Sequence, residues 1–199
     1  MARGRSFDET AAIDAATERF WKHGYAATSV RDLGEAMGLG AASLYNAFGD
    51  KRALFERCLD QYLDANMRAR IGHLETTLPP RQAIEVLLAN IVERSLRERL
   101  GCMLVNTALE VAPHDSAIAD TVAARLGELE AFFRRCVIAG QREGSINPDR
   151  DASDLARLLL TTVIGMRVLA RGRPERDLLE GAVRQILALF DTPCKDVPS

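Results

Sequence analysis

Apolar residues recur at helical spacing along almost the whole chain, and no segment shows the apolar–polar alternation of a half-buried strand. The first helix is expected to open at a capping box made by Ser6 and Glu9 and to end at Gly24. One face of this helix carries the apolar residues Ala12, Ile13, Ala16 and Phe20. The pattern therefore predicts an all-α protein from its first element onward.

Residues 28–52 contain two short amphipathic segments separated by glycine. The first has an apolar face of Val30, Leu33, Gly34 and Met37, and Thr28 is its expected N-cap. Gly38 interrupts it, and residues 39–48 form a second short helix whose Leu44 and Phe48 point back at the first. This is the layout of a helix-turn-helix, in which the second helix lies in the major groove of DNA.

A long helix is predicted from an N-cap at Asp50 to about residue 76, or roughly 40 Å. Pro79 and Pro80 interrupt it. Further helices are expected over residues 81–98, 101–113, 115–143, 151–171 and 174–191. We therefore expect about nine helices, arranged as an N-terminal helix-turn-helix domain over residues 1–52 and a second helical domain over residues 53–199.

Composition and charge change this picture little. The chain of 199 residues has a net charge of −2, which is a mild argument against nucleic acid. Residues 1–52 hold seven basic and seven acidic residues (7 − 7 = 0), so a neutral N-terminal domain can still carry a local basic edge. No apolar run is long enough to span a membrane, and the first residues have no apolar signal core, so a cytoplasmic location is expected.

An enzyme is the main alternative from another class. The histidines His23, His73 and His114 are scattered, and none belongs to a recognisable nucleophile or metal motif. The four cysteines are far apart and have no CxxC spacing. We therefore expect neither a catalytic site nor a metal or cofactor. A helical protein-interaction adaptor that does not bind DNA is a third alternative.

Residues 9–55 resemble the N-terminal DNA-binding domain of the TetR family of bacterial transcriptional regulators. The resemblance lies in the runs AAIDAATERFWKHGYAATSV and RDLGEAMGLGAASLYNAFGDKRALF. It implies a homodimeric repressor that binds a palindromic operator, associates with the nucleoid and is released by a small-molecule effector. The remaining residues resemble the family only in being a helical effector and dimerisation domain of fitting length.

The resemblance also implies which residues contact DNA. Arg31 falls at a groove-contacting position, where arginine suits guanine O6 and N7, and Asn46 suits adenine. Tyr45 and Lys51 match phosphate-contacting positions of the family, and the hydroxyl of Thr28 is a further candidate. Between them, the small residues Ala41, Ala42 and Ser43 permit close approach to the bases. Each has a plainer alternative, such as a solvated charge, a cap or a residue at the core edge.

Effector sites in the family lie in the C-terminal domain, which here indicates Tyr62, Met67, Cys102, Asn106, Leu109 and Phe133. Dimerisation is expected through residues 151–191. Two apolar stripes run along this region, and each suits a dimer interface, an internal core, or both. They consist of Leu155, Leu158, Leu159, Thr162, Val163 and Met166, and of Leu179, Val183, Ile186, Leu187 and Phe190.

Cys102 supports a second mode of sensing. The segment from Gly101 to Val105 resembles a stretch of TetR-family repressors that sense electrophiles or oxidants through a cysteine. Such sensing requires an accessible thiolate, which a helix N-terminus favours, and Cys102 lies at the start of a predicted helix. The alternative is an inert thiol packed as a small apolar group.

Overall fold

The computed structural model describes residues 7–191, so Ser6 of the predicted capping box lies outside the described residues, as does Cys194. Within the described range the chain forms helices and no strand, which confirms the predicted all-α class. Residues 7–191 form nine helices when α4 (Lys51–Leu63), the π-helical turn after it and α5 (Ala69–Thr77) are counted as one. No helix between residues 7 and 191 is long and apolar enough to cross a membrane.

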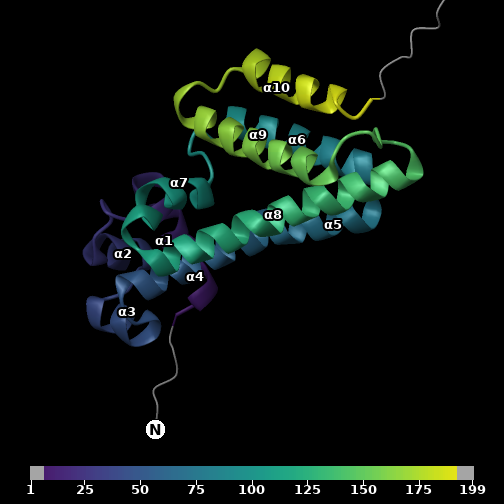
Figure 1. Cartoon of the computed structure of the whole chain (residues 1–199). Helices are drawn as coiled ribbons and strands as arrows, with labels where there is room; N and C mark the ends of the chain where they lie inside the picture. The colour runs from purple at the N-terminus through teal and green to yellow at the C-terminus, as the bar shows by residue number, and fades with distance from the viewer. Residues whose placement is uncertain (1–6, 192–199) are drawn as a thin grey trace, which may run out of the picture. The chain divides into compact units, whose positions relative to one another are not determined.

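The helices follow one another in the order expected, with ends that differ from the prediction by at most a few residues (Figure 1). Their bounds are α1 (Glu9–His23), α2 (Val30–Met37), α3 (Ala41–Phe48), α4 (Lys51–Leu63), the π-helical turn η1 (Asp64–Arg68), α5 (Ala69–Thr77), α6 (Pro80–Arg97), α7 (Met103–Glu110), the 3-10 turn η2 (Ala112–His114), α8 (Ser116–Glu143), α9 (Ala152–Gly172) and α10 (Arg176–Ala188). The π-helical turn within the long helix was not predicted.

The chain divides into two compact units that do not follow its linear order. The first extends to Ala69 and includes Cys102–Val122, so α7 belongs to the same unit as α1, α2, α3 and α4. The second contains Arg70–Gly101 and the chain from Ala123 onward. A segment that begins 50 residues after the helix-turn-helix region (102 − 52) therefore belongs to the unit that contains it.

The first unit is built by packing α1 against α2 and α4. The predicted apolar face of α1 is buried, and Phe20 meets Phe55 of α4 edge to face, with ring centroids 5.0 Å apart. Asp8 is the observed N-cap of α1, since its carboxylate accepts hydrogen bonds from the N–H groups of Thr10 and Ala11. The predicted caps at Gly24 and Asp50 are confirmed.

In the second unit α6, α9 and α10 pack together around an apolar core. Arg167 of α9 is also buried there, with 6% of its surface exposed. Its guanidinium donates hydrogen bonds to the Ser95 hydroxyl of α6, at 3.1 Å, and to the Gly101 carbonyl. Both acceptors are neutral, and no carboxylate accepts a hydrogen bond from Arg167 within residues 7–191. The two bonds connect α9 to α6 and to the segment that follows α6.

Candidate nucleic-acid interface

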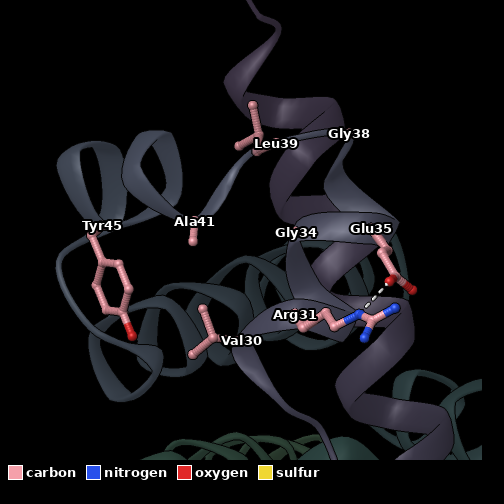
Figure 2. Close-up of a pocket in the computed structure, with 8 residues that line it drawn as sticks. All are labelled: Val30, Arg31, Gly34, Glu35, Gly38, Leu39, Ala41 and Tyr45. Carbon is pink, nitrogen blue, oxygen red and sulfur yellow. Dashed lines mark hydrogen bonds and ion pairs between the residues drawn. The ribbon is translucent and has the colours of Figure 1, made fainter.

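A shallow hollow of about 560 Å³ lies between α2 and α3 on the surface of the first unit. Figure 2 shows Tyr45 of α3 at one end of the hollow and Arg31 of α2 at the other, with Val30 between them. The lining residues are Val30, Arg31, Gly34, Glu35, Gly38, Leu39, Ala41 and Tyr45. The hollow thus brings together three of the residues predicted to contact DNA, which are Arg31, Ala41 and Tyr45.

Local chemistry fixes the two helices around this hollow. Gly38 ends α2 in the left-handed conformation, with φ of 65°, which glycine adopts without steric cost. The Leu39 N–H then donates to the Gly34 carbonyl at 2.8 Å and turns the chain into α3. Leu33 and Leu44 are fully buried beneath the turn. Because these two side chains hold the helices from below, the opposite faces of α2 and α3 remain at the surface.

The structure corrects the prediction for Thr28. The N-cap of α2 is Ser29, whose hydroxyl accepts from the Asp32 N–H, while the Asp32 carboxylate accepts from the Ser29 N–H in a reciprocal capping box. Thr28 is fully buried, and its hydroxyl donates to the Gly24 carbonyl at 2.7 Å. A buried and already bonded hydroxyl is not positioned to reach a phosphate, so Thr28 supports the loop from inside.

The predicted reading face of α3 is exposed. Ala41, Ala42, Ser43 and Asn46 all lie at the surface. Tyr45 has half of its surface exposed, so its ring is not buried in the core. From Ala36 to Gly49 the chain has no charged side chain, so α3 presents small and neutral groups to whatever it meets.

Arg31 is exposed as predicted, and the structure adds a partner that the sequence reasoning missed. Its Nε donates to the Glu35 carboxylate one helical turn later, at 2.9 Å. This hydrogen bond raises the pKa of Arg31 above its ordinary value. The spacing of four residues was a visible signal for this pair, because side chains at i and i+4 are neighbours on a helix.

Lys51 does not line the hollow. Its Nζ lies 4.2 Å from the centroid of the Tyr25 ring, in a cation–π contact. Partial burial lowers the pKa of Lys51, and the negative charge of Glu110 opposes that shift. The neighbouring Arg52 is paired with Asp115 at 3.0 Å. The ammonium of Lys51 therefore contacts the Tyr25 ring in the free protein. Its predicted contact with a DNA phosphate stays a prediction.

Glu110, at the end of α7, is a second residue that sequence reasoning missed. Its carboxylate accepts a hydrogen bond from the Ala26 N–H at 2.8 Å, in the loop that precedes α2. It also lies directly against Gly24, where an added Cβ would be 2.7 Å from a carboxylate oxygen. Since 84 residues separate Glu110 from Ala26, no local pattern could have indicated the contact.

The residues predicted to bind an effector have different surroundings. Tyr62 is buried on α4, Met67 is half-buried in the π-helical turn, and both belong to the first unit. Cys102 and Asn106 are half-buried in that unit too, whereas Leu109 is largely exposed. Phe133 belongs to the second unit and is fully buried beside Phe132. Their joint role in an effector site stays a prediction.

Two of the three described cysteines are buried. Burial raises the pKa of Cys58 to about 12 and that of Cys136 to about 11, so both thiols stay neutral at physiological pH. Cys102 is half-buried and is the N-cap residue of α7. Among the described cysteines it is the most accessible to a reagent.

Comparison with known proteins decides the family. Residues 12–58 match the model for bacterial regulatory proteins of the tetR family, and residues 79–186 match a tetracyclin repressor-like C-terminal domain. The chain belongs to the TetR family. Being a TetR-family protein, it is a DNA-binding transcriptional regulator, as its helix-turn-helix predicted.

Several TetR-family relatives match most of this chain. The transcriptional repressor ComR of Escherichia coli is 34% identical over 178 residues, which cover 85% of this chain and 83% of ComR. The transcriptional regulator YezE of Bacillus subtilis is 29% identical and is matched over its full length, with 96% of this chain covered. A cysteine-substituted form of the regulator CifR, solved with a 26-base-pair operator duplex, has a TM-score of 0.84 and 32% identity, covering 96% of this chain and 100% of that one.

Proposed function

We propose that this regulator represses transcription by placing α3 in the major groove of its operator, with the hollow between α2 and α3 facing the DNA. The observation that carries this proposal is the joint exposure of Arg31 and Tyr45 at the two ends of one hollow. In this arrangement Arg31 reads guanine O6 and N7, and Asn46 pairs with adenine. Tyr45 donates its hydroxyl to a phosphate.

The small residues of α3 give the rest of the surface its character. Ala41 and Ala42 offer methyl groups that suit contact with the thymine methyl, and Ser43 offers one short hydroxyl. Such side chains provide few directional hydrogen bonds to base edges. We therefore expect sequence preference to depend on Arg31, on Asn46 and on the shape of the duplex. The structure of CifR with operator DNA supports this proposal, because that protein binds an operator duplex and shares the fold over nearly the whole chain.

The regulator is proposed to act as a homodimer through residues 151–191. The apolar residues predicted for this region divide into a buried set and an exposed set. The buried set, packed within the chain, consists of Leu155, Leu159, Val163, Met166, Leu179, Ile186 and Phe190. Leu158 and Val168 instead remain exposed on α9, and Thr161 and Gly165 continue the same uncharged face. A second copy is the proposed occupant, since a two-fold dimer places two reading helices about 34–36 Å apart on a palindrome.

A small-molecule effector is proposed to release the dimer from DNA. The proposed division of labour assigns DNA binding to residues 1–52 and effector binding and dimerisation to residues 53–199. The candidate effector contacts remain Tyr62, Met67, Cys102, Asn106, Leu109 and Phe133. Among them, Asn106 is a half-buried amide on the apolar helix α7, which suits a polar group of a ligand.

The experiment that tests this proposal is selection of bound duplexes from a random 26-base-pair library, followed by sedimentation of the selected complex. A palindromic sequence bound by two chains of 21.9 kDa is expected. Binding should weaken steeply as salt increases, because phosphate contacts release counterions. Recovery of no common sequence, or of a complex holding one chain, would contradict the proposed mode of binding.

Tyr45→Phe is expected to weaken binding of the selected duplex by about 10- to 150-fold, the effect of losing one hydrogen bond to a charged phosphate. The slope of affinity against salt should stay the same, since no charge is removed. Tyr25→Phe is the matched control, because Tyr25 stacks against Phe20 and lies outside the hollow. Equal affinities of Tyr45→Phe and the parent protein would remove Tyr45 from the proposed phosphate contacts.

Thiol-based sensing through Cys102 is a second candidate, favoured by the burial of the other described cysteines. In a Cys194→Ser background, iodoacetamide at pH 8 should modify Cys102 well before Cys58 and Cys136, because the raised pKa values keep those two thiols protonated. Peptide mass spectrometry measures the order, with full labelling in urea as the control. If a mild electrophile releases DNA equally from the parent and from Cys102→Ser, thiol sensing through this residue is wrong.

A further inference from the structure

The hollow contains one carboxylate, and it is bonded to the arginine proposed to read the bases. Glu35 and Arg31 lie one turn apart on the exposed face of α2, and both line the hollow (Figure 2). A carboxylate at a DNA-facing surface repels phosphates, so its presence there requires a reason beyond packing. The geometry of the pair supplies one.

The Arg31–Glu35 bond occupies only one side of the guanidinium. Nε donates to Glu35 Oε1 at 2.9 Å, and the N–H groups on Nη1 and Nη2 have no hydrogen-bond acceptor among residues 7–191. Bidentate recognition of guanine requires two parallel N–H groups directed at O6 and N7. The two Nη groups form such a pair, and they remain available while Nε is held.

The neighbouring carboxylate cannot replace Glu35. Asp32 accepts hydrogen bonds from the Ser29 N–H and hydroxyl and forms an ion pair with Arg19 at 3.2 Å. These contacts lower the pKa of Asp32 and keep its charge directed toward the cap of α2. Glu35 is therefore the acidic side chain that bonds to Arg31 within the described part of the chain.

We propose that Glu35 is a positioning residue for base recognition: it holds the Arg31 side chain extended along α2, with its terminal N–H pair directed at a guanine. This inference rests on the proposed DNA-binding mode. A free arginine has many rotamers and loses that freedom when it binds, so holding it in advance lowers the entropic cost for the correct base. The same negative charge weakens binding to every sequence, which lowers affinity without changing the preference between sequences.

The two effects of Glu35 predict changes in opposite directions when its charge is removed. Glu35→Gln and Glu35→Ala should strengthen binding to unrelated duplexes, because a charge that repels phosphates is lost. They should also reduce discrimination at the guanine read by Arg31 by roughly 2- to 10-fold, the effect of freeing one side chain of this kind. Glutamine keeps an acceptor oxygen, so its effect should be the smaller of the two.

The test measures affinities of each variant for the selected duplex and for every single base-pair substitution of it. Arg31→Ala identifies the position that Arg31 reads. Glu35→Gln should reduce discrimination at that position alone, and it should change nothing there in the Arg31→Ala background. Glu18→Gln is the matched control, because Glu18 forms an exposed pair with Lys22 at the same spacing outside the hollow.

The possible outcomes distinguish failure of the inference about Glu35 from failure of the proposed DNA-binding mode. If Glu35→Gln strengthens binding to all duplexes alike, Glu35 is only a surface charge and the inference is wrong. If Arg31→Ala leaves every base preference unchanged, the proposed role of Arg31 fails as well. A local loss of discrimination that Glu18→Gln does not reproduce supports both.

Discussion

Arg167→Met is expected to lower the free energy of unfolding by about 2–4 kcal/mol. The Ser95 side chain is fully buried and Gly101 is buried, so both would lose a hydrogen-bond donor with no water to replace it. Each orphaned polar group costs about 1–3 kcal/mol. Relief from burying a guanidinium offsets part of that loss, since methionine fills similar space without a charge.

Urea unfolding at one fixed protein concentration measures this effect, because association of copies would itself change the apparent stability. Arg157→Met is the matched control on the same helix: Arg157 is largely exposed, and its ion pairs with Asp154 and Glu130 should contribute less than about 1 kcal/mol. Equal free energies of unfolding for Arg167→Met and the parent would contradict this prediction. That result would mean that the free-energy cost of burying the guanidinium equals the stabilisation from its hydrogen bonds.

The same buried arginine illustrates what periodicity can and cannot predict. The apolar repeat of α9 predicted the helix and its buried face, and the end of the helix was correct to within a residue. It did not predict that Arg167 turns inward, because the partner that makes burial tolerable is Ser95, 72 residues earlier in the sequence. Periodicity likewise could not separate Leu155, which is internal, from Leu158, which is exposed, since one broad stripe contains both.

The candidate DNA surface was more predictable, because a helix-turn-helix is formed by residues close together in the sequence. The exposed positions of α3 and of Arg31 followed from helical spacing together with the family resemblance. The misplaced cap has a local cause: Thr28 and Ser29 both carry hydroxyls, and only the reciprocal bond with Asp32 selects Ser29. The contact of Glu110 with Ala26 could not be predicted in this way, because it joins residues far apart in the sequence and depends on how α7 packs within the unit.

Gly24→Ala is expected to destabilise the first unit by about 2–4 kcal/mol and to weaken operator binding with it. Gly24 has φ of 85° and ψ of 168°, a conformation that is essentially restricted to glycine and costs other residues about 1–3 kcal/mol. The new methyl group would also displace the Glu110 carboxylate, which lies 2.7 Å from the Cβ position. The Ala26 N–H would then lose its acceptor at the entrance to α2.

Two further variants separate these causes. Glu110→Ala removes the obstructing carboxylate, so the double variant Gly24→Ala/Glu110→Ala should be more stable than the sum of the single effects predicts. In the Glu110→Ala background, Gly24→Ala should add the backbone strain alone. Gly72→Ala should have the opposite sign and add about 0.5–1 kcal/mol, because Gly72 is helical with open space around its Cβ position. Additive single effects would show that Glu110 moves aside freely. In that case the carboxylate would not fix the loop before α2, and operator affinity should then follow the stability of the unit alone.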